Sequence, residues 1–333
     1  MNRTQRLLLL LIFLNFSCKS QTKKINGVSF VASRDSISSK HINPVLNLQS
    51  NYVALMPFGF IKDLSSPIIT HNTEKQWFGE TKKGLLQYAK RFQQAKVHIL
   101  VKPQIWVWQG AFTGGIKMKS EENWKRLEDS YRDFILTYAK AAESLHAEIF
   151  CIGTELEQFV LNRPLYWQKL IQDIRIIYTG KLTYAANWDE FKRVTFWKDL
   201  DFIGIDAYFP LSKKKSPTIV EFELGWKGHK ASILRIHKQF NKPVMFTEYG
   251  YRSVDFNGKK PWDSEQSEGA VNLKAQANAL QAIHNQFWKE EWFAGGFIWK
   301  WFHKHDNVGG DNNNRFTPQN KPAEKLIRKL YGF

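Results

Sequence analysis

The sequence predicts an α/β protein folded as a (β/α)8 TIM barrel. Eight short apolar runs alternate with longer helical segments, as expected for repeated β–α units around a closed parallel sheet. The chain has 333 residues, 43% of them hydrophobic, and a single barrel of this kind occupies that length. No internal repeat and no low-complexity linker divides the sequence. We therefore expect one barrel domain over residues 26–333.

The strands are predicted from apolar runs that stop at polar residues or at proline. They are expected at residues 26–33, 52–56, 97–101, 148–152, 181–186, 201–205, 243–247 and 294–299. Pro57 ends the second run, and Pro103 follows the third after one residue. Helices are expected at residues 81–95, 121–145, 164–178, 218–240, 266–288 and 322–331. Long polar loops follow the seventh and eighth strands.

The N-terminus resembles an export signal. Arg3 and Arg6 precede an apolar run over residues 7–16, which is too short to span a bilayer as a helix. Ser17-Cys18 then resembles a bacterial lipoprotein cleavage site. We expect a signal peptide over residues 1–17, lipidation of Cys18 and a linker over residues 18–25, which makes the protein an exported lipoprotein anchored in a membrane, in the periplasm or at the cell surface. The alternative is an ordinary signal peptide in which Cys18 is incidental.

Charge and cysteine content limit the other classes. The formal net charge is +17, but the longest basic run is only Lys213 to Lys215 and no nucleic-acid motif accompanies it. We expect a generally basic surface, no nucleic-acid partner and a monomer. A third hypothesis, suggested by charge alone, is a basic surface protein that binds anionic glycans or nucleic acid. The chain has two cysteines, Cys18 and Cys151, so acylation of Cys18 would leave no pair for an internal disulfide.

The residues at the carboxyl ends of the predicted strands carry the chemistry, since that end of a barrel forms the active site. In chain order they are Lys102, Gln104, Trp106, Trp108, Thr154, Glu155, Glu157, Asn187, Trp188, Asp206, Tyr208, Glu248, Tyr249, Trp299, Lys300 and Trp301. Two acids on opposite walls, surrounded by aromatic and polar side chains, predict a carbohydrate site. We expect Glu155 and Glu248 to be catalytic, and substrate contacts from Lys102, Gln104, Trp106, Thr154, Asn187, Trp188, Asp206, Tyr208, Tyr249 and Trp299.

Cleavage of a glycosidic bond with retention needs one protonated carboxyl group and one ionised carboxylate about 5–5.5 Å apart. Strands four and seven can hold such a pair on rigid elements. Two alternatives remain open: Glu157 could take the role of Glu155, and Glu248 could instead be a buried ion-pair partner of Arg252. His303 and His305 invite a metal interpretation, but no third ligand is evident. We expect no metal and no cofactor.

Four segments resemble clan A glycoside hydrolases, and family 113 in particular. They are CIGTELE at 151–157, FIGIDAYFP at 202–210, VMFTEYGY at 244–251 and GGFIW at 295–299. The likeness extends from about residue 27 to residue 323. It implies that Glu155 is the general acid/base and Glu248 the nucleophile of a retaining β-glycosidase, and that the substrate is β-1,4-mannan or a related β-linked polysaccharide or oligosaccharide. Thr154 and Gln104 depart from the family pattern of Asn and His. A non-catalytic glycan-binding lipoprotein is the alternative function.

Overall fold

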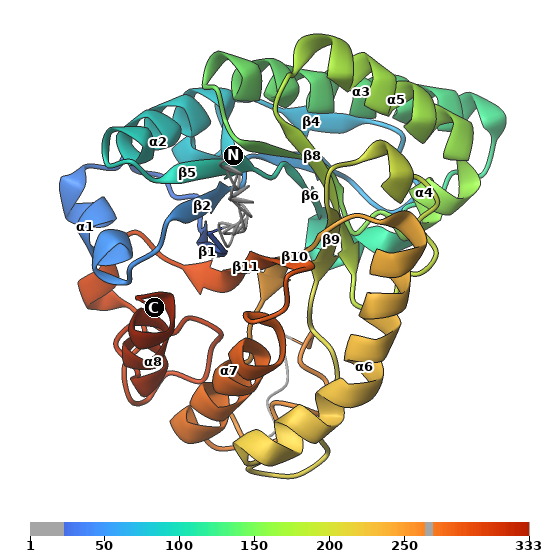
Figure 1. The fold of residues 1–333 in the computed structure, drawn as a ribbon. Coiled ribbons are helices and arrows are strands. Elements are labelled where there is room, and N and C mark those ends of the chain that lie inside the picture. Colours follow the sequence, from blue (N-terminus) through green and yellow to red (C-terminus); the bar gives the residue numbers. More distant parts are fainter. Residues whose placement is uncertain (1–22, 264–268, 333) are drawn as a thin grey trace, which may run out of the picture.

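The computed structural model describes residues 23–263 and 269–332 and forms a closed barrel of eight parallel strands (Figure 1). The strands are β1 (Ile25–Phe30), β2 (Tyr52–Leu55), β5 (His98–Val101), β7 (Ile149–Thr154), β8 (Lys181–Asn187), β9 (Ile203–Asp206), β10 (Val244–Tyr249) and β11 (Phe293–Trp301). They pair in this order, and β11 closes the barrel against β1. The predicted TIM barrel is confirmed, and each predicted strand overlaps an observed one.

Helices surround the barrel: α1 (Ser39–Asn47), α2 (Lys82–Gln94), α3 (Glu121–Ser144), α4 (Glu157–Asn162), α5 (Pro164–Ile177), α6 (Ile219–Phe240), α7 (Leu273–Phe287) and α8 (Pro322–Tyr331) (Figure 1). The prediction missed α1, which contains Pro44, and the short α4. It also began α7 too early, because the Asn272 side chain caps this helix by accepting the Ala275 N–H at 2.9 Å.

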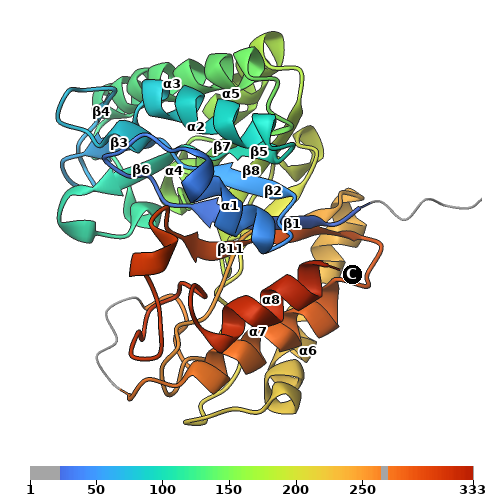
Figure 2. The same ribbon diagram turned by 90° about the vertical axis from the view of Figure 1, so that its left-hand side faces the viewer.

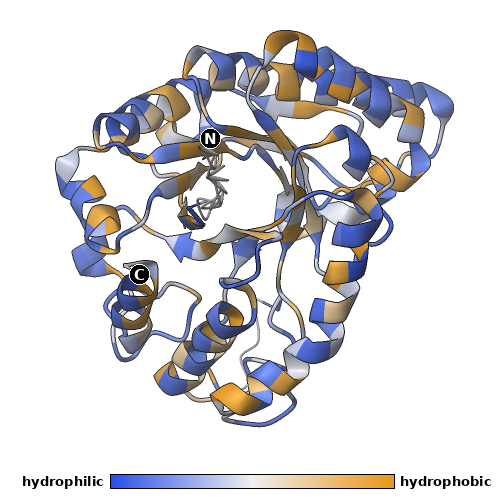
Figure 3. Cartoon of the chain, viewed as in Figure 1, coloured by the Kyte–Doolittle hydropathy of each residue, from blue (hydrophilic) through white to orange (hydrophobic). Residues whose placement is uncertain are grey.

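Two apolar layers hold the fold together. The outer helices carry both apolar and polar residues (Figure 3), and their apolar residues pack against the barrel wall. In α3, for example, Trp124, Leu127, Tyr131 and Phe134 are buried. Inside the barrel a smaller cluster consists of Ile25, Ala54, Leu100, Ile149, Cys151, Ala185, Met245 and Phe297. This inner cluster fills the barrel below its carboxyl end, so the interior is a core and not a channel.

A second sheet of three strands extends one wall of the barrel mouth. It consists of β3 (Phe58–Ile61), β4 (Ile69–His71) and β6 (Gln104–Val107), in the order β4-β3-β6. β3 follows β2 and β6 follows β5, so the sheet continues beyond two neighbouring barrel strands, on the side away from the chain's entry into β1 (Figure 2). The sequence analysis did not predict this sheet.

The predicted leader, the lipidation site Cys18 and most of the linker lie outside the described residues. Cys151, the other cysteine, is buried as a free thiol. No helix in the described ranges combines the length and apolar composition needed to cross a membrane.

Candidate active site

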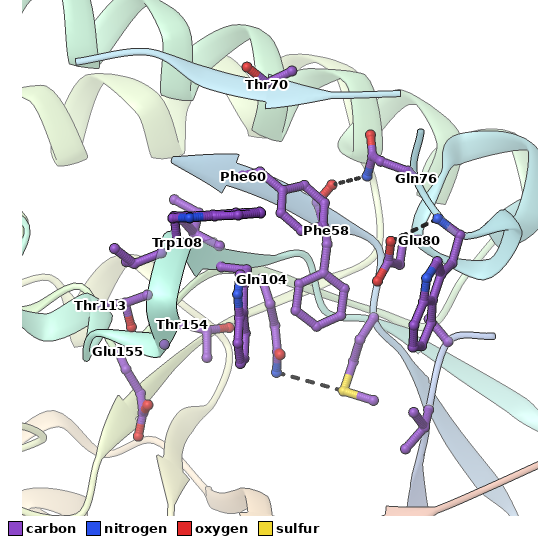
Figure 4. A pocket seen from close by; sticks show the side chains of 18 of the residues that line it. Phe58, Phe60, Thr70, Gln76, Glu80, Gln104, Trp108, Thr113, Thr154 and Glu155 are labelled. Carbon is purple, nitrogen blue, oxygen red and sulfur yellow. Dashed lines mark hydrogen bonds between the residues drawn. The ribbon is translucent and has the colours of Figure 1, made fainter. Parts of the chain in front are cut away.

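A cavity of about 920 Å³ opens at the carboxyl end of the barrel, between the strand ends and the small sheet (Figure 4). Six of the predicted site residues line it: Gln104, Trp106, Thr154, Glu155, Glu248 and Trp299. They come from β6, β7, β10 and β11 and from the residue directly after β7. The fold thus brings the two proposed catalytic acids, which are 93 residues apart in sequence, to one cavity.

Glu155 directly follows β7 and has a left-handed backbone, with φ of 51°. A residue with a Cβ adopts this conformation only where its surroundings hold it. Here the Glu155 N–H donates to the carbonyl of Ala185 at 2.8 Å. The next N–H, of Leu156, donates to the Tyr184 hydroxyl at 2.7 Å, and that hydroxyl donates to Glu190 at 2.6 Å. Strand β8 and Glu190 therefore hold the turn that presents Glu155.

The electrostatic surroundings of Glu155 favour its protonated form. Burial raises the pKa of Glu155 well above its usual value, and the carboxylates of Asp206 and Glu248 raise it further. Lys102 opposes this effect without overcoming it. A carboxyl group that keeps its proton near neutral pH can donate it to a leaving oxygen.

Glu248 has a different environment, because hydrogen-bond donors reach both of its oxygens. Tyr208 donates its hydroxyl to Oε2 at 2.7 Å, and Gln104 donates Nε2–H to Oε1 at 3.0 Å. Lys102 forms an ion pair with Oε1. These contacts fix the orientation of the carboxyl group at the cavity wall. The two acids thus occupy unlike environments, as acid and nucleophile roles require.

Lys102 and Asp206 do not lie where the sequence analysis expected. Both are almost fully buried, with 0% and 1% of the residue exposed, and neither lines the cavity. Lys102 Nζ donates to the two Asp206 oxygens at 3.1 and 3.2 Å, and Thr247 donates to Asp206 Oδ1 at 2.7 Å. Burial lowers the pKa of Lys102, but Asp206 and Glu248 more than offset this and raise it. In this structure the pair therefore lies behind Glu248, and its predicted contact with substrate stays a prediction.

Tyr249 also lies away from the cavity. Side chains alternate along a strand, so Glu248 faces inward and Tyr249 faces the helices. The Tyr249 hydroxyl lies 2.7 Å from that of Tyr331 on α8, and its ring packs against Trp288. The side chain is completely buried there and does not line the cavity.

Asn187 and Trp188 reach the carboxyl end of β8 but do not line the cavity. The Asn187 side chain accepts the Trp188 N–H at 2.7 Å, and Trp188 stacks on Trp262 with ring centroids 5.0 Å apart. Tyr208 is also absent from the lining and serves Glu248 instead. Of these three residues, Tyr208 contacts a residue of the cavity wall, and none of them lines the cavity in this structure.

The two alternatives for the acids can now be judged by position. Glu157 is the first residue of α4, forms an ion pair with Arg193 and does not line the cavity. Glu248 is indeed paired with a cation, but that cation is Lys102, and Glu248 still lines the cavity. Of the three acids considered, Glu155 and Glu248 line the cavity, and the charge of Glu248 raises the pKa of Glu155.

An aromatic wall on the small sheet and its loops was largely missed by the sequence analysis. Phe58 and Phe60 of β3 lie in the cavity beside Gln104 and Trp108 (Figure 4). Trp77, Trp106, Trp108 and Phe112 also line it, and 44–68% of each of these four residues is exposed. Large exposed rings gathered in one cavity are typical of surfaces that stack on sugar rings. The sequence feature that could have revealed this wall is the large number of aromatic residues after the second and third predicted strands.

His303 and His305 line one small pocket, but their rings contact different acids. His303 lies 3.4 Å from Asp35, whereas His305 contacts Glu324 at 2.9 Å. Among the described residues there is no cluster of three or more His, Cys, Asp or Glu side chains that could hold a metal ion.

A (β/α)8 barrel with an acid at the end of strand four, an acid on strand seven and an aromatic-lined cavity between them defines the class of barrel glycosidases. The comparisons agree with this class. The sequence model of Glycoside Hydrolase Family 113 matches residues 32–321, and the chain therefore belongs to this family of glycoside hydrolases.

Similar solved structures share the fold across nearly the whole chain. A family 113 β-mannanase from Alicyclobacillus acidocaldarius has a TM-score of 0.81 and 23% identity, over 93% of this chain and 97% of its own. A second family 113 structure, a β-1,4-mannanase, has a TM-score of 0.80 and 22% identity over 93% and 99% of the two chains. A β-glucuronidase from Faecalibacterium prausnitzii has a TM-score of 0.60 and 15% identity, over 93% of this chain and 49% of its own. Comparison with curated protein sequences gives no match.

Proposed function

We propose that this family 113 glycoside hydrolase is a retaining β-glycosidase, with Glu155 as the general acid/base and Glu248 as the nucleophile. The observation that carries the proposal is the unlike environment of two carboxyl groups that line one cavity. Burial and neighbouring charge raise the pKa of Glu155, while Lys102, Gln104 and Tyr208 donate to Glu248. One group is suited to giving a proton and the other to attack.

The reaction would proceed in two displacements. Glu248 attacks the anomeric carbon while Glu155 gives its proton to the departing glycosidic oxygen, and a covalent glycosyl ester forms on Glu248. Glu155, now ionised, takes a proton from water, which attacks the same carbon and releases the sugar. Each displacement inverts the configuration at the anomeric carbon, so after both steps the product keeps the β configuration. When the ester breaks, Glu248 becomes a carboxylate again, and Lys102, Gln104 and Tyr208 stabilise its negative charge by hydrogen bonding.

For the substrate we propose a β-linked polysaccharide or oligosaccharide, cleaved in the manner of an endo-β-1,4-mannanase. The similar family 113 structures are β-mannanases, and the cavity extends from the two acids along the aromatic wall of the small sheet, which offers room for several sugar rings. Trp299 lines the cavity near Glu248 as a stacking platform. Gln104, Thr154 and Trp106 add polar and aromatic contacts.

The test is hydrolysis of defined oligosaccharides by the purified enzyme. We expect cleavage of β-linked manno-, gluco- or xylo-oligosaccharides, and proton NMR should detect the β anomer as the first product. An α anomer appearing first would mean that Glu248 activates water and is not the nucleophile. Binding of glycans without any hydrolysis would support the alternative, a non-catalytic glycan-binding lipoprotein.

We further propose that the chain is exported and anchored to a membrane through lipidated Cys18. The support is the sequence pattern of residues 1–18, in which a short apolar run ends at Ser17-Cys18. An exported enzyme of this kind would meet polysaccharide outside the cytoplasm.

A further inference from the structure

Strand β11 places a lysine in the cavity next to the proposed nucleophile. Lys300 and its neighbour Trp299 both line the cavity that holds Glu155 and Glu248. The Lys300 ammonium lies 5.2 Å from the centre of the Trp299 ring and 5.3 Å from that of Phe302. These distances fit cation–π contacts, which hold the side chain between two rings.

The Lys300 ammonium makes no hydrogen bond and no ion pair within residues 23–263 and 269–332. Lysine has three N–H donors, and the contrast with Lys102 is clear, because Lys102 contacts two carboxylates. Burial lowers the pKa of Lys300, with Glu248 opposing that change and Arg315 adding to it. The cavity therefore contains a partly desolvated cation whose donors are directed to no protein acceptor.

Such a group favours an anionic ligand. A carboxylate would restore the hydrogen bonds that the ammonium gives up on burial, and charge-assisted bonds are stronger than those to a neutral hydroxyl. Two other acids, Glu80 and Glu248, line the cavity as well, but Lys102 pairs with Glu248, burial raises the pKa of Glu80, and the raised pKa of Glu155 favours its uncharged form. Lys75 also lines the cavity, and the chain as a whole has a formal net charge of +17.

We propose that Lys300 binds an anionic group carried by the sugar ring beside Glu248, so that the enzyme prefers β-glycosides of uronic acids, or glycans bearing them, over neutral ones. This inference rests on the proposed glycosidase function and names the substrate class that the same cavity would take. A carboxylate at the sugar C6 position replaces a CH2OH group and adds little volume, so the neutral sugar would bind in the same way without the charged contact.

The experiment compares matched substrates that differ only at C6. Aryl β-mannosides and β-glucosides are paired with the corresponding mannuronides and glucuronides, or oligosaccharides are paired in the same way if aryl glycosides are not cleaved. We expect the wild-type enzyme to have a kcat/KM about 10-fold or more higher for the carboxylate member, the size of effect that one charge-assisted hydrogen bond gives. In Lys300→Met and Lys300→Gln this ratio should fall to about one or below.

Lys304→Met is the matched control. Lys304 follows β11 and forms an ion pair with Asp35 at 2.9 Å, and it does not line this cavity. Its loss removes the same charge from the same segment, so the substrate ratio should stay at the wild-type value. Titration calorimetry with the Glu155→Gln variant repeats the comparison as binding, separately from turnover.

The outcomes separate the two proposals. Hydrolysis of neutral substrates with retention, but no preference for the carboxylate, would overturn the inference on Lys300 and leave the glycosidase proposal intact. An equal loss on both substrates in Lys300→Met would also overturn it, because Lys300 would then act on Glu248 and not on the ligand. No hydrolysis and no binding of either member would contradict the glycosidase function itself.

Discussion

Lys102 Nζ lies 3.1 and 3.2 Å from the two carboxylate oxygens of Asp206, inside a barrel that exposes neither side chain to the cavity. The same ammonium also contacts Glu248. One buried cation thus serves two carboxylates, and only one of these reaches the substrate space. It offsets the negative charge and fixes the orientation of Glu248, the proposed nucleophile.

We predict that Lys102→Met lowers the free energy of unfolding by about 3–5 kcal/mol, because it leaves buried carboxylates without their cation. Urea unfolding measured by circular dichroism gives this value. Lys169→Met is the control: its ion pair with Asp173 has an exposed lysine, and its removal should cost less than about 1 kcal/mol. A loss for Lys102→Met no larger than for the control would show that the buried ion pair does not contribute.

The two acids give the most direct prediction. Glu155→Gln and Glu248→Gln should fold normally and lose hydrolysis by at least roughly 10²–10⁴-fold, since neither amide can donate a proton or attack carbon in place of the acid. Initial rates on the best oligosaccharide, with melting temperatures as a check on folding, measure this. Glu157→Gln, which changes an acid outside the cavity, should keep near wild-type rates. An active Glu248→Gln enzyme would end the assignment of the nucleophile.

The pH profile should respond to Asp206. In the proposed mechanism Glu155 acts with its proton bound, so activity should fall as pH rises through its pKa. The Asp206 carboxylate contributes to raising that pKa. Asp206→Asn removes the contribution, so the alkaline limb of kcat/KM should move to lower pH, by about 1 unit. Thr247→Val removes a hydrogen bond to Asp206 without removing charge, and should leave the limb in place. A shift of the limb to higher pH in Asp206→Asn would contradict this account.

Trp106 provides a prediction about substrate length. Half of this residue is exposed on β6 in the aromatic wall. In Trp106→Ala, kcat/KM for long oligosaccharides should fall roughly 2- to 10-fold through lost stacking, while the shortest substrate hydrolysed should be less affected. The control is Leu165→Ala, which removes an exposed apolar side chain on α5, away from the cavity. Equal losses for every chain length would argue against a stacking role.

The anchor is tested on the protein expressed in a bacterial host. Mass spectrometry should find a mature N-terminus at Cys18 carrying lipid, and the protein should fractionate with membranes. In Cys18→Ser the protein should leave the membrane fraction. Cleavage at another residue, with Cys18 unmodified, would show that the cysteine is incidental.

Much of the fold could be predicted because parallel barrel strands are short continuous apolar runs that helices separate. The small sheet could not be predicted in this way. β3 and β4 have four and three residues, and β3 pairs in parallel with β6, which lies more than 40 positions later in the sequence. Pairing over such a distance leaves no local pattern to recognise.

The site residues divide along the same line. Because Glu155, Glu248, Gln104, Thr154 and Trp299 lie at or near strand ends in the sequence, they could be predicted to share one cavity, and all five line it. Position after a strand did not reveal depth, which is why Lys102 and Asp206 were expected to touch substrate although they are buried below it. Nor did it distinguish the two faces of a strand end, so Tyr249 was placed with Glu248 although alternation directs it to α8. Depth and face depend on strand register around the barrel, which adjacent residues do not encode.

The three-stranded sheet has a consequence for how such an enzyme could change over time. Its strands form hydrogen bonds with one another, while the two acids and the donors Lys102 and Tyr208 lie on the barrel strands or within two residues of their ends. From this sheet, Gln104 donates a hydrogen bond to Glu248, the proposed nucleophile. Insertions or substitutions between β3 and β4, or after β6, would therefore change the substrate-binding surface while the two proposed catalytic acids stay in place. Exchange of this sheet between related genes could therefore change which glycan is bound without any change in the proposed catalytic residues.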